Sequence, residues 1–201
     1  MDKLTVLITT SGLGSRLGEK TKYINKALIR VGDKPIISHI LNFYKKNTEF
    51  IITIGHKGDL VKQYLELAHS DLDIKYVEID KYDGKGSSLL YSMSLAKKHL
   101  QKPFVFHVSD AIIDMSDSFD YKKNFIVGSK DGDPSYYSSF NIKNSFVENI
   151  FSKGEIDSDL NYVGVANIID YKSLYALNQE NVHFSPAGYE FLVKFISKEI
   201  N

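Results

Sequence analysis

The chain has 201 residues, of which 43% are hydrophobic and 25% charged, a composition typical of a globular protein rather than a disordered one. Its 25 basic and 25 acidic residues leave no formal net charge, which disfavours binding of nucleic acid through a broad basic surface. It contains no cysteine, which excludes disulfides, zinc–thiolate sites and a cysteine nucleophile. No apolar run approaches the roughly 20 residues that span a bilayer, and the N-terminus is unlike a signal peptide, so we expect a cytoplasmic protein.

Short apolar runs alternate with helix-like segments over the first 110 residues. Strands are predicted for residues 3–10, 50–56, 73–80 and 103–110. Helices are predicted for residues 35–46, 59–69 and 87–100. This alternation indicates a parallel sheet with helices on both faces, in which ligands gather at the carboxyl ends of the strands. The loop after the first strand and Asp110 both lie at such ends.

The rhythm changes after about residue 120, where short strands are joined by polar turns. Strands are predicted for residues 124–130, 135–143, 145–153 and 161–169, and helices for 170–179 and 186–200. We therefore expect an α/β fold: a Rossmann-like, mostly parallel central sheet flanked by helices, with a β-rich C-terminal extension. No repeat or linker divides the chain, so residues 1–201 are expected to form a single domain.

A glycine-rich loop, "TTSGLGSRLGEKTKYINKAL", follows the first strand and suggests a phosphate site. A Walker A loop requires G-x-x-x-x-G-K-[ST], but Gly12 and Gly18 are one residue too far apart and Glu19 precedes Lys20. A dinucleotide fingerprint requires G-x-G-x-x-G, but Leu17 stands where the third glycine belongs. The residues after the loop also do not read as a helix that begins there. Both interpretations are weak.

The loop instead resembles that of the sugar-phosphate nucleotidylyltransferases, in which Leu-Ala-Ala-Gly-x-Gly-[Ser/Thr]-Arg-Leu is followed by Pro-Lys-Ala-Leu and Gly-x-[Lys/Arg]-Pro. The matching segments are Thr9-Thr10-Ser11-Gly12-Leu13-Gly14-Ser15-Arg16-Leu17, Asn25-Lys26-Ala27-Leu28 and Gly32-Asp33-Lys34-Pro35. Thr9-Thr10-Ser11 thus replaces Leu-Ala-Ala, and Asn25 replaces proline.

The chemistry of nucleotidyl transfer accounts for these residue types. Glycines let the backbone wrap a triphosphate, Arg16 offers a bidentate clamp for its β/γ oxygens, and Lys26 adds a second mobile positive charge. The resemblance therefore implies catalytic roles for Arg16 and Lys26. It implies nucleotide contacts from Ser11, Gly12, Leu13, Gly14 and Ser15.

Three later segments extend the resemblance to about residue 174. Residues 83–96 resemble the family's segment that starts a helix beside the base, where Gly86 and Ser87 would contact the nucleotide and Ser87 or Ser88 would cap the helix. Residues 103–114 resemble the strand that ends in Gly-Asp, with Ser109 for the glycine and Asp110 as the magnesium ligand. Residues 146–155 resemble Val-x-x-Ile-x-Glu-Lys-Pro, and Lys153 matches the lysine that contacts the acceptor's phosphate.

The resemblance implies a Mg²⁺-dependent enzyme that couples an NTP to a phosphorylated acceptor. A sugar 1-phosphate is the favoured acceptor. The products would be pyrophosphate and an NDP-sugar for surface polysaccharide synthesis. Residues 1–120 would bind the NTP and residues 121–201 the acceptor. We expect the NTP and the acceptor as binding partners, and we expect no binding of nucleic acid or of a membrane. Assembly into a homo-oligomer is left open.

Two alternatives for the function remain. One is a cytidylyltransferase for a non-sugar phosphate such as phosphocholine, whose quaternary ammonium is caged by aromatic rings. Aromatic candidates for such a cage are Tyr136, Tyr137, Phe140 and Tyr162. The other is a non-catalytic nucleotide-binding homologue, because the expected context of a second acidic metal ligand is missing. Nominal candidates for that ligand are Asp170, Glu180, Asn181 and Glu190.

The C-terminal segment suggests a rival class. Residues 181–189 resemble the closing block of SGNH-type esterases, where Asp-x-x-His serves a serine nucleophile. Here Asn181 stands at the position of the aspartate, and His183 is the candidate histidine. No Gly-Asp-Ser motif precedes them in the chain. Ser185-Pro186 as the start of a C-terminal amphipathic helix is the simpler interpretation.

Overall fold

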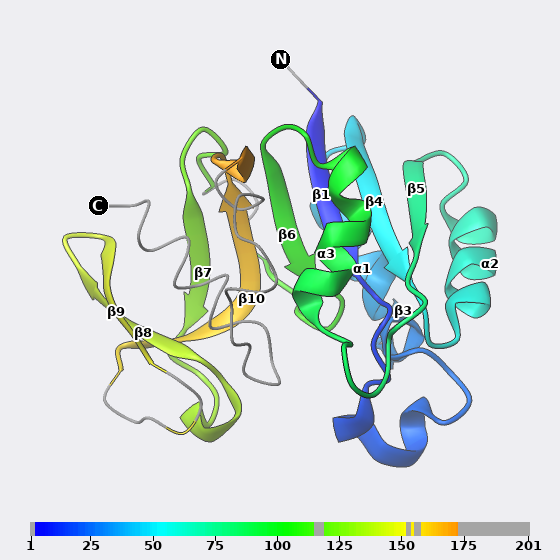
Figure 1. Cartoon of the computed structure of the whole chain (residues 1–201), viewed down its shortest axis with the longest axis horizontal. Coiled ribbons are helices and arrows are strands. Elements are labelled where there is room, and N and C mark those ends of the chain that lie inside the picture. Colours follow the sequence, from blue (N-terminus) through cyan, green and yellow to red (C-terminus); the bar gives the residue numbers. More distant parts are fainter. Residues whose placement is uncertain (1–2, 115–118, 152–153, 155–157, 173–201) are drawn as a thin grey trace.

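The structure, a computed structural model, describes residues 3–114, 119–151, 154 and 158–172. One sheet of eight strands runs through it in the order β5-β4-β1-β6-β10-β8-β9, with β7 also paired to β10 (Figure 1). The strands are β1 (Leu4–Thr9), β4 (Thr48–Ile54), β5 (Asp73–Glu78), β6 (Phe104–Val108), β7 (Phe125–Ser129), β8 (Ser139–Lys143), β9 (Phe146–Phe151) and β10 (Leu160–Ile168). β5, β4, β1 and β6 are parallel, and the pairs made by β7 to β10 are antiparallel. The predicted fold class is confirmed.

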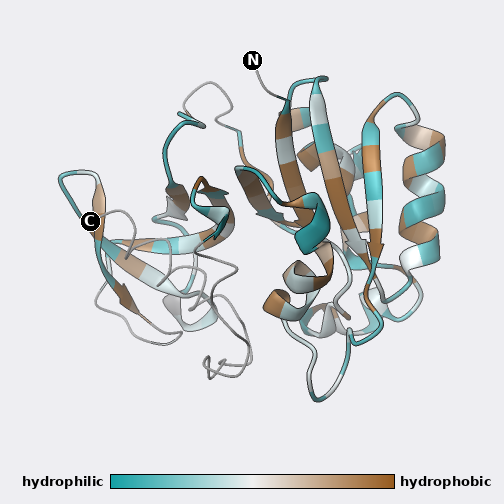
Figure 2. Ribbon diagram, turned by 45° about the horizontal axis from the view of Figure 1, so that its top comes forward, coloured by the Kyte–Doolittle hydropathy of each residue, from teal (hydrophilic) through white to brown (hydrophobic). Residues whose placement is uncertain are grey.

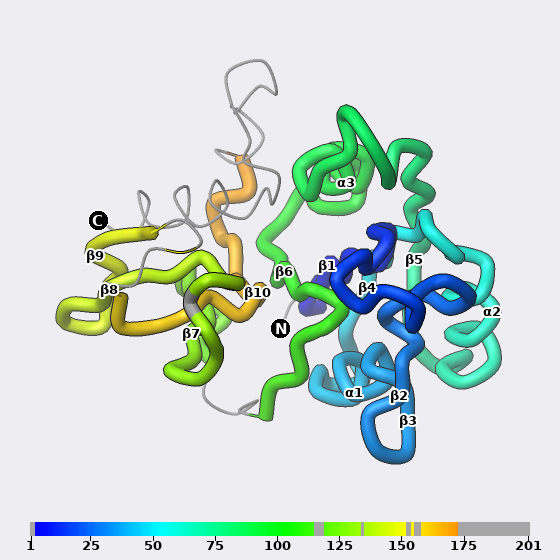
Figure 3. Tube along the Cα trace, turned by 90° about the horizontal axis from the view of Figure 1, so that it is seen from below, coloured from blue at the N-terminus to red at the C-terminus, as the bar shows by residue number. Residues whose placement is uncertain are grey.

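Helices cover both faces of the parallel part of the sheet (Figure 3). α1 (Ile36–Phe43) and α2 (Gly58–Ala68) lie on one face, and α3 (Leu89–Ala96) lies on the other. Side chains alternate along a strand, so Val6 and Ile8 of β1 join the core beneath α1 and α2, while Leu7 joins the core beneath α3. Figure 2 shows the apolar central strands and the more hydrophilic α2.

Short elements connect these layers. They are the 3₁₀ helices η1 (Ser15–Thr21), η2 (Lys26–Leu28), η3 (Lys97–His99) and η5 (Pro134–Tyr136), and a two-stranded ribbon of β2 (Arg30–Val31) and β3 (Lys34–Pro35). No helix in the described part of the chain has the length and apolar character needed to cross a membrane.

The predicted strands 50–56, 73–80 and 103–110 each end two residues earlier than expected. β5 stops at Glu78. β4 stops at Ile54, so Gly55 and His56 belong to the loop that follows. β6 stops at Val108, so Ser109 and Asp110 lie in a turn beyond the last ladder residue. The apolar pattern marks the buried ladder but not the point at which pairing stops. The helix predicted for residues 186–200 lies outside the described residues. So does the helix predicted for residues 170–179 from position 173 on.

The β-rich extension joins the main sheet through β10, which pairs antiparallel with β6. Gly164, at φ +85°, lies where the pairing of β10 with β7 changes register. A Cβ at this position would lie 2.5 Å from Cγ2 of Val108, so only glycine lets β10 approach the end of β6 this closely. The extension therefore packs directly beside the turn that carries Asp110.

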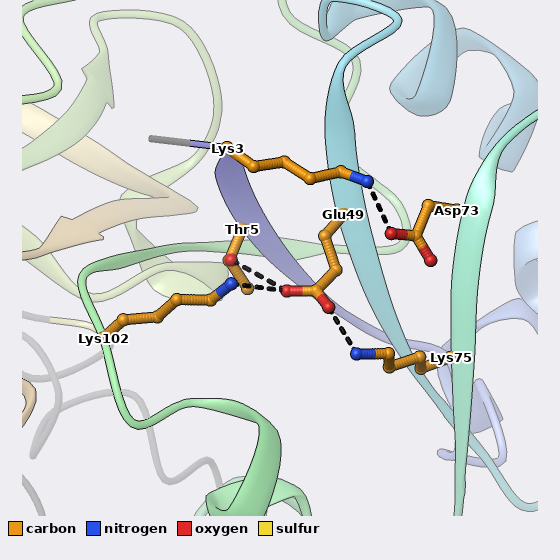
Figure 4. Close-up of polar contacts among 6 residues, drawn as sticks. All are labelled: Lys3, Thr5, Glu49, Asp73, Lys75 and Lys102. Carbon is orange, nitrogen blue, oxygen red and sulfur yellow. Dashed lines mark hydrogen bonds and ion pairs between the residues drawn. The ribbon is translucent and has the colours of Figure 1, made fainter. Parts of the chain in front are cut away.

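A charged cluster lies at the opposite, amino-terminal end of the parallel strands (Figure 4). The Glu49 carboxylate, 9% exposed, accepts hydrogen bonds from Lys75 at 2.5 Å, Lys102 at 2.7 Å and Thr5 at 3.2 Å. Burial would raise the pKa of Glu49, but its bonds to Lys102 and Lys75 outweigh burial and lower the pKa to about 2. This cluster ties β1, β4 and β5 together.

Candidate functional site

The carboxyl ends of β1, β4 and β6 meet at one edge of the sheet. Thr9, the last residue of β1, is in register with Thr53 of β4 on one side and with Val108 of β6 on the other. The segments that follow these residues are the glycine-rich loop, the Gly55-His56 loop and the Asp110 turn. Strand order therefore brings three segments that are far apart in sequence to one place.

Hydrogen bonds with β4 and with the loop that follows it hold the base of the glycine-rich loop. The backbone N–H and the Oγ1 of Thr10 donate to the Thr53 carbonyl at 3.1 and 2.7 Å, and the His56 N–H donates to the Ser11 carbonyl at 2.9 Å. The buried hydroxyl of Ser11 lies 3.4 Å from that of Ser92 on α3. Thr10 and Ser11, which stand at the alanine positions of the nucleotidylyltransferase pattern that the loop resembles, thus line this base with hydroxyl groups.

The outer part of the loop follows Gly12 and forms η1. Gly14 has a φ of +68°, and a Cβ there would lie 2.9 Å from Cγ2 of Thr21. The Thr21 hydroxyl donates to the carbonyls of Gly14 and Gly18 at 3.3 and 3.1 Å, which closes the loop on itself. Ser15 and Arg16 are exposed. The loop thus enters an irregular 3₁₀ segment, broken at Gly18, instead of the α-helix that a dinucleotide fingerprint requires.

Asn25, which replaces the family's proline, is fully buried and joins three segments. Its Nδ2 donates to the carbonyls of Thr10 at 2.8 Å and His56 at 2.7 Å, and its Oδ1 accepts from the Ala27 N–H at 2.9 Å. Its φ of −69° is one that proline would also adopt. The amide therefore fixes the backbone just before Lys26, a role that the sequence pattern alone did not indicate.

Lys26 and Asp110, two of the predicted site residues, form an ion pair although they are 84 positions apart. Lys26 Nζ lies 3.0 Å from Asp110 Oδ2, with the lysine side chain 18% exposed and the aspartate side chain 48% exposed. A half-exposed carboxylate at a strand end suits Mg²⁺, which is commonly held by one or two carboxylates together with substrate phosphates. The donor set therefore fits the predicted metal.

The described residues supply no cluster of metal-ligating side chains to accompany Asp110. No three His, Cys, Asp or Glu side chains in residues 3–114, 119–151 and 158–172 gather as a metal site. Asp170 belongs to this part of the chain, whereas Glu180, Asn181 and Glu190 lie outside it. The esterase-like segment with His183 and Ser185 lies outside it too.

The loop before α3 carries the predicted base-side residues. Ser88 caps α3, because its Oγ accepts from the Tyr91 N–H at 3.0 Å. Ser87 instead donates from its hydroxyl to the Gly84 carbonyl at 2.8 Å. Gly86 is exposed at a φ of +93°, and a Cβ there would meet no atom within 4 Å. Gly86 and Ser87 therefore lie on an accessible loop. Of the two serines predicted as possible caps of α3, Ser88 is the one that caps the helix.

Gly55 is a further residue of the site, which was predicted only as part of a strand. A Cβ at Gly55 would lie 2.9 Å from the Ser11 carbonyl oxygen and 2.9 Å from Cδ1 of Tyr82. A glycine directly after a buried strand was the available signal, since such glycines mark close backbone approach. It lets the glycine-rich loop pack against the loop after β4.

The predicted acceptor residues are only partly described. Lys153 lies outside the described residues. Tyr136 and Tyr137 are 61% and 40% exposed, whereas Phe140 and Tyr162 are buried in a cluster with Val147. The four aromatic residues therefore do not line a common cage, because two of them form the core of the extension.

No protein-family model matches the chain. Over 76 residues it is 36% identical to a probable glucose-1-phosphate cytidylyltransferase of Bacillus subtilis, a match that covers 35% of the chain and 30% of the relative. It is 29% identical over 104 residues to a choline-phosphate cytidylyltransferase of Streptococcus pneumoniae, covering 51% of the chain and 43% of the relative. The resemblance to nucleotidylyltransferases is thus confirmed in sequence, although the match spans less than a third of the first curated relatives' length.

Solved structures confirm the fold. A putative glucose-1-phosphate thymidylyltransferase from Bacillus anthracis superposes with a TM-score of 0.78 at 22% identity, covering 98% of this chain and 83% of that one. A UDP-glucose pyrophosphorylase complexed with UDP-glucose gives a TM-score of 0.76 at 15% identity, covering 98% and 88%. At these identities the likeness concerns the fold alone.

Proposed function

We propose that the chain is a nucleotidylyltransferase that couples an NTP to a phosphorylated acceptor. The favoured acceptor is a sugar 1-phosphate. The observation that carries this proposal is the Lys26–Asp110 pair at 3.0 Å beside the glycine-rich loop. Lys26 on η2, beside a carboxylate just after the end of β6, offers a cation for a triphosphate and a ligand for its Mg²⁺. The cytidylyltransferases among the relatives support the same chemistry.

In the proposed reaction, a phosphate oxygen of the acceptor attacks the α-phosphorus of the NTP in line. A new P–O bond forms to the acceptor, the bond between the α-phosphorus and the bridging oxygen breaks, and pyrophosphate leaves with that oxygen. The chain itself undergoes no covalent change, so positioning and charge neutralisation provide the acceleration. The expected product with a sugar 1-phosphate is an NDP-sugar.

The proposed roles follow from placement. Backbone from Ser11 to Ser15 binds the phosphates, and the exposed Arg16 clamps the leaving pyrophosphate. Lys26 turns from Asp110 to the reacting phosphates, a movement that its flexible side chain allows. Asp110 would hold Mg²⁺, which when bound neutralises charge on the phosphate oxygens.

The remaining assignments complete the proposal. Gly86 and Ser87 contact the nucleotide from the loop before α3, and Lys153 contacts the acceptor's phosphate. Residues 1–120 act as the NTP-binding half and residues 121–201 as the acceptor-binding half, in the cytoplasm.

Pyrophosphate release tests the proposal. The protein is incubated with each of the four NTPs, Mg²⁺ and a panel of sugar 1-phosphates. A parallel incubation contains choline phosphate, the alternative acceptor that one relative suggests. Arg16→Ala and Asp110→Asn should each lower turnover about 100-fold or more, since each removes charge stabilisation of the transition state. Lys46→Ala, at a side chain 93% exposed and paired with Asp71 only at 3.8 Å, is the control.

Three results would contradict the proposal. The first is unchanged pyrophosphate release by both Arg16→Ala and Asp110→Asn. The second is an NTP that binds the wild-type protein without turnover on any acceptor, which would identify a non-catalytic nucleotide-binding homologue. The third is pyrophosphate release with choline phosphate alone, which would replace the sugar acceptor by the non-sugar one.

A further inference from the structure

His107 is a fully buried polar side chain in β6, three residues before Asp110. It lies on the face of the sheet that packs against α1, where its neighbour in the strand pattern, Val105, belongs to the apolar core. Its Nδ1 lies 2.7 Å from the Tyr44 hydroxyl, and its Nε2 lies 3.0 Å from the Ala111 carbonyl oxygen. Both ring nitrogens are therefore hydrogen-bonded inside the core, as a buried imidazole requires.

The partners define the direction of both hydrogen bonds. A carbonyl oxygen can only accept, so Nε2 carries the proton and donates to Ala111. Nδ1 of the neutral ring is then an acceptor and receives the hydrogen bond of the Tyr44 hydroxyl. Burial lowers the pKa of His107 to about 4 and raises the pKa of Tyr44, so both side chains stay neutral near pH 7.

Tyr44 is itself held firmly. It follows the last residue of α1, is 7% exposed, and packs edge-on against Phe43 and Phe50 with ring centroids 5.0 and 6.0 Å away. The hydrogen-bonded chain therefore runs from the end of a packed helix, through the His107 ring, to the carbonyl of Ala111. Ala111 directly follows Asp110, in the turn beyond the end of β6.

We propose that His107, oriented by Tyr44, is a positioning residue that holds the Asp110 turn so that its carboxylate faces the phosphate loop. The inference rests on the proposed function for the role of Asp110. The ring touches neither substrate nor metal and acts through the Ala111 carbonyl. Losing a hydrogen-bond partner of a metal ligand itself commonly lowers metal affinity 10- to 100-fold; His107 acts through the next residue of the backbone, so we expect an effect at the lower end of that range.

Two substitutions at His107 separate this contact from packing. Gln places its amide nitrogen about where Nε2 lies and can still donate to Ala111, whereas Asn reaches only as far as Nδ1 and cannot. Tyr44→Phe removes only the hydroxyl that orients the ring. Tyr64→Phe is the matched control, because it removes a tyrosine hydroxyl that hydrogen-bonds Ser38 at 2.7 Å between α1 and α2, away from the turn.

The readout is Mn²⁺ binding to the intact chain, followed by the loss of the free-ion electron paramagnetic resonance signal, with the midpoint of thermal unfolding measured in parallel. We expect His107→Asn to weaken Mn²⁺ binding about tenfold and Tyr44→Phe severalfold. His107→Gln should recover most of the affinity that His107→Asn loses, and Tyr64→Phe should bind Mn²⁺ as the wild type does.

The outcomes separate this inference from the proposed function. Equal Mn²⁺ affinity of wild type, His107→Asn and His107→Gln, with lowered unfolding midpoints, would overturn the inference and leave His107 as a packing residue. Absence of Mn²⁺ binding by the wild type, or binding that Asp110→Asn does not weaken, would also overturn it. If the expected pattern appears but no NTP and acceptor release pyrophosphate, the positioning role stands and the proposed function fails.

Discussion

Replacing Glu49 by glutamine should destabilise the protein in a pH-dependent way. The pKa of this carboxyl falls from 4.5 to about 2 on folding, because the bonds to Lys102 and Lys75 outweigh its burial. The difference between these two pKa values corresponds to about 3 kcal/mol of stabilisation at neutral pH. The side chains of Lys75 and Lys102 are 48% and 45% exposed, so solvent screening reduces this to roughly 2 kcal/mol.

The sign of the pH dependence follows from the lowered pKa. The stabilisation is fully present above about pH 4.5 and is lost as the pH falls through about 2, so less than half of it remains at pH 3. Urea unfolding of wild type and Glu49→Gln at pH 7 and pH 3 measures the difference in the free energy of unfolding. Glu66→Gln, which removes an exposed carboxylate 4.0 Å from Lys62, is the control.

Two results would refute this reasoning. One is a difference between wild type and Glu49→Gln that stays the same at pH 7 and pH 3, because a contact unrelated to charge would give that. The other is a difference below about 0.5 kcal/mol at pH 7, which would place the cluster among exposed ion pairs.

Three further predictions concern the site. Asn25→Ala leaves the Thr10 and His56 carbonyls without its amide, so the free energy of unfolding should fall by about 2–4 kcal/mol, measured by denaturant unfolding; a loss below about 0.5 kcal/mol would contradict this role. Gly14→Ala introduces a Cβ at a φ of +68° and should lower NTP affinity at least tenfold in calorimetric titration, and unchanged affinity would argue against a structured phosphate loop. Lys26→Met should change stability by less than about 1 kcal/mol yet reduce pyrophosphate release about 100-fold, and parallel losses would mark Lys26 as structural.

Much of the fold could be predicted from local pattern. Alternating and periodic apolar residues predicted the strands and helices up to residue 110, and polar turns predicted the β-rich extension, because periodicity reflects which side of each element is buried. The position of Asp110 at the end of its strand was also predictable. The ends of β4, β5 and β6 were not, because pairing stops where the neighbouring strand ends, which a single segment does not encode.

The sequence by itself indicated the type of loop. The Gly12–Gly18 spacing disfavours a Walker A loop, Leu17 disfavours a dinucleotide fingerprint, and Gly12, Gly14 and Arg16 resemble a third class. Only the tertiary structure decided which residues meet there. The order β4-β1-β6 brings Lys26 within 3.0 Å of Asp110, and the packing of α1 on the sheet joins His107 to Tyr44, the residue after α1. Such contacts depend on strand order and helix packing, which are long-range properties of the whole chain, whereas motif spacing reports only on neighbours along it.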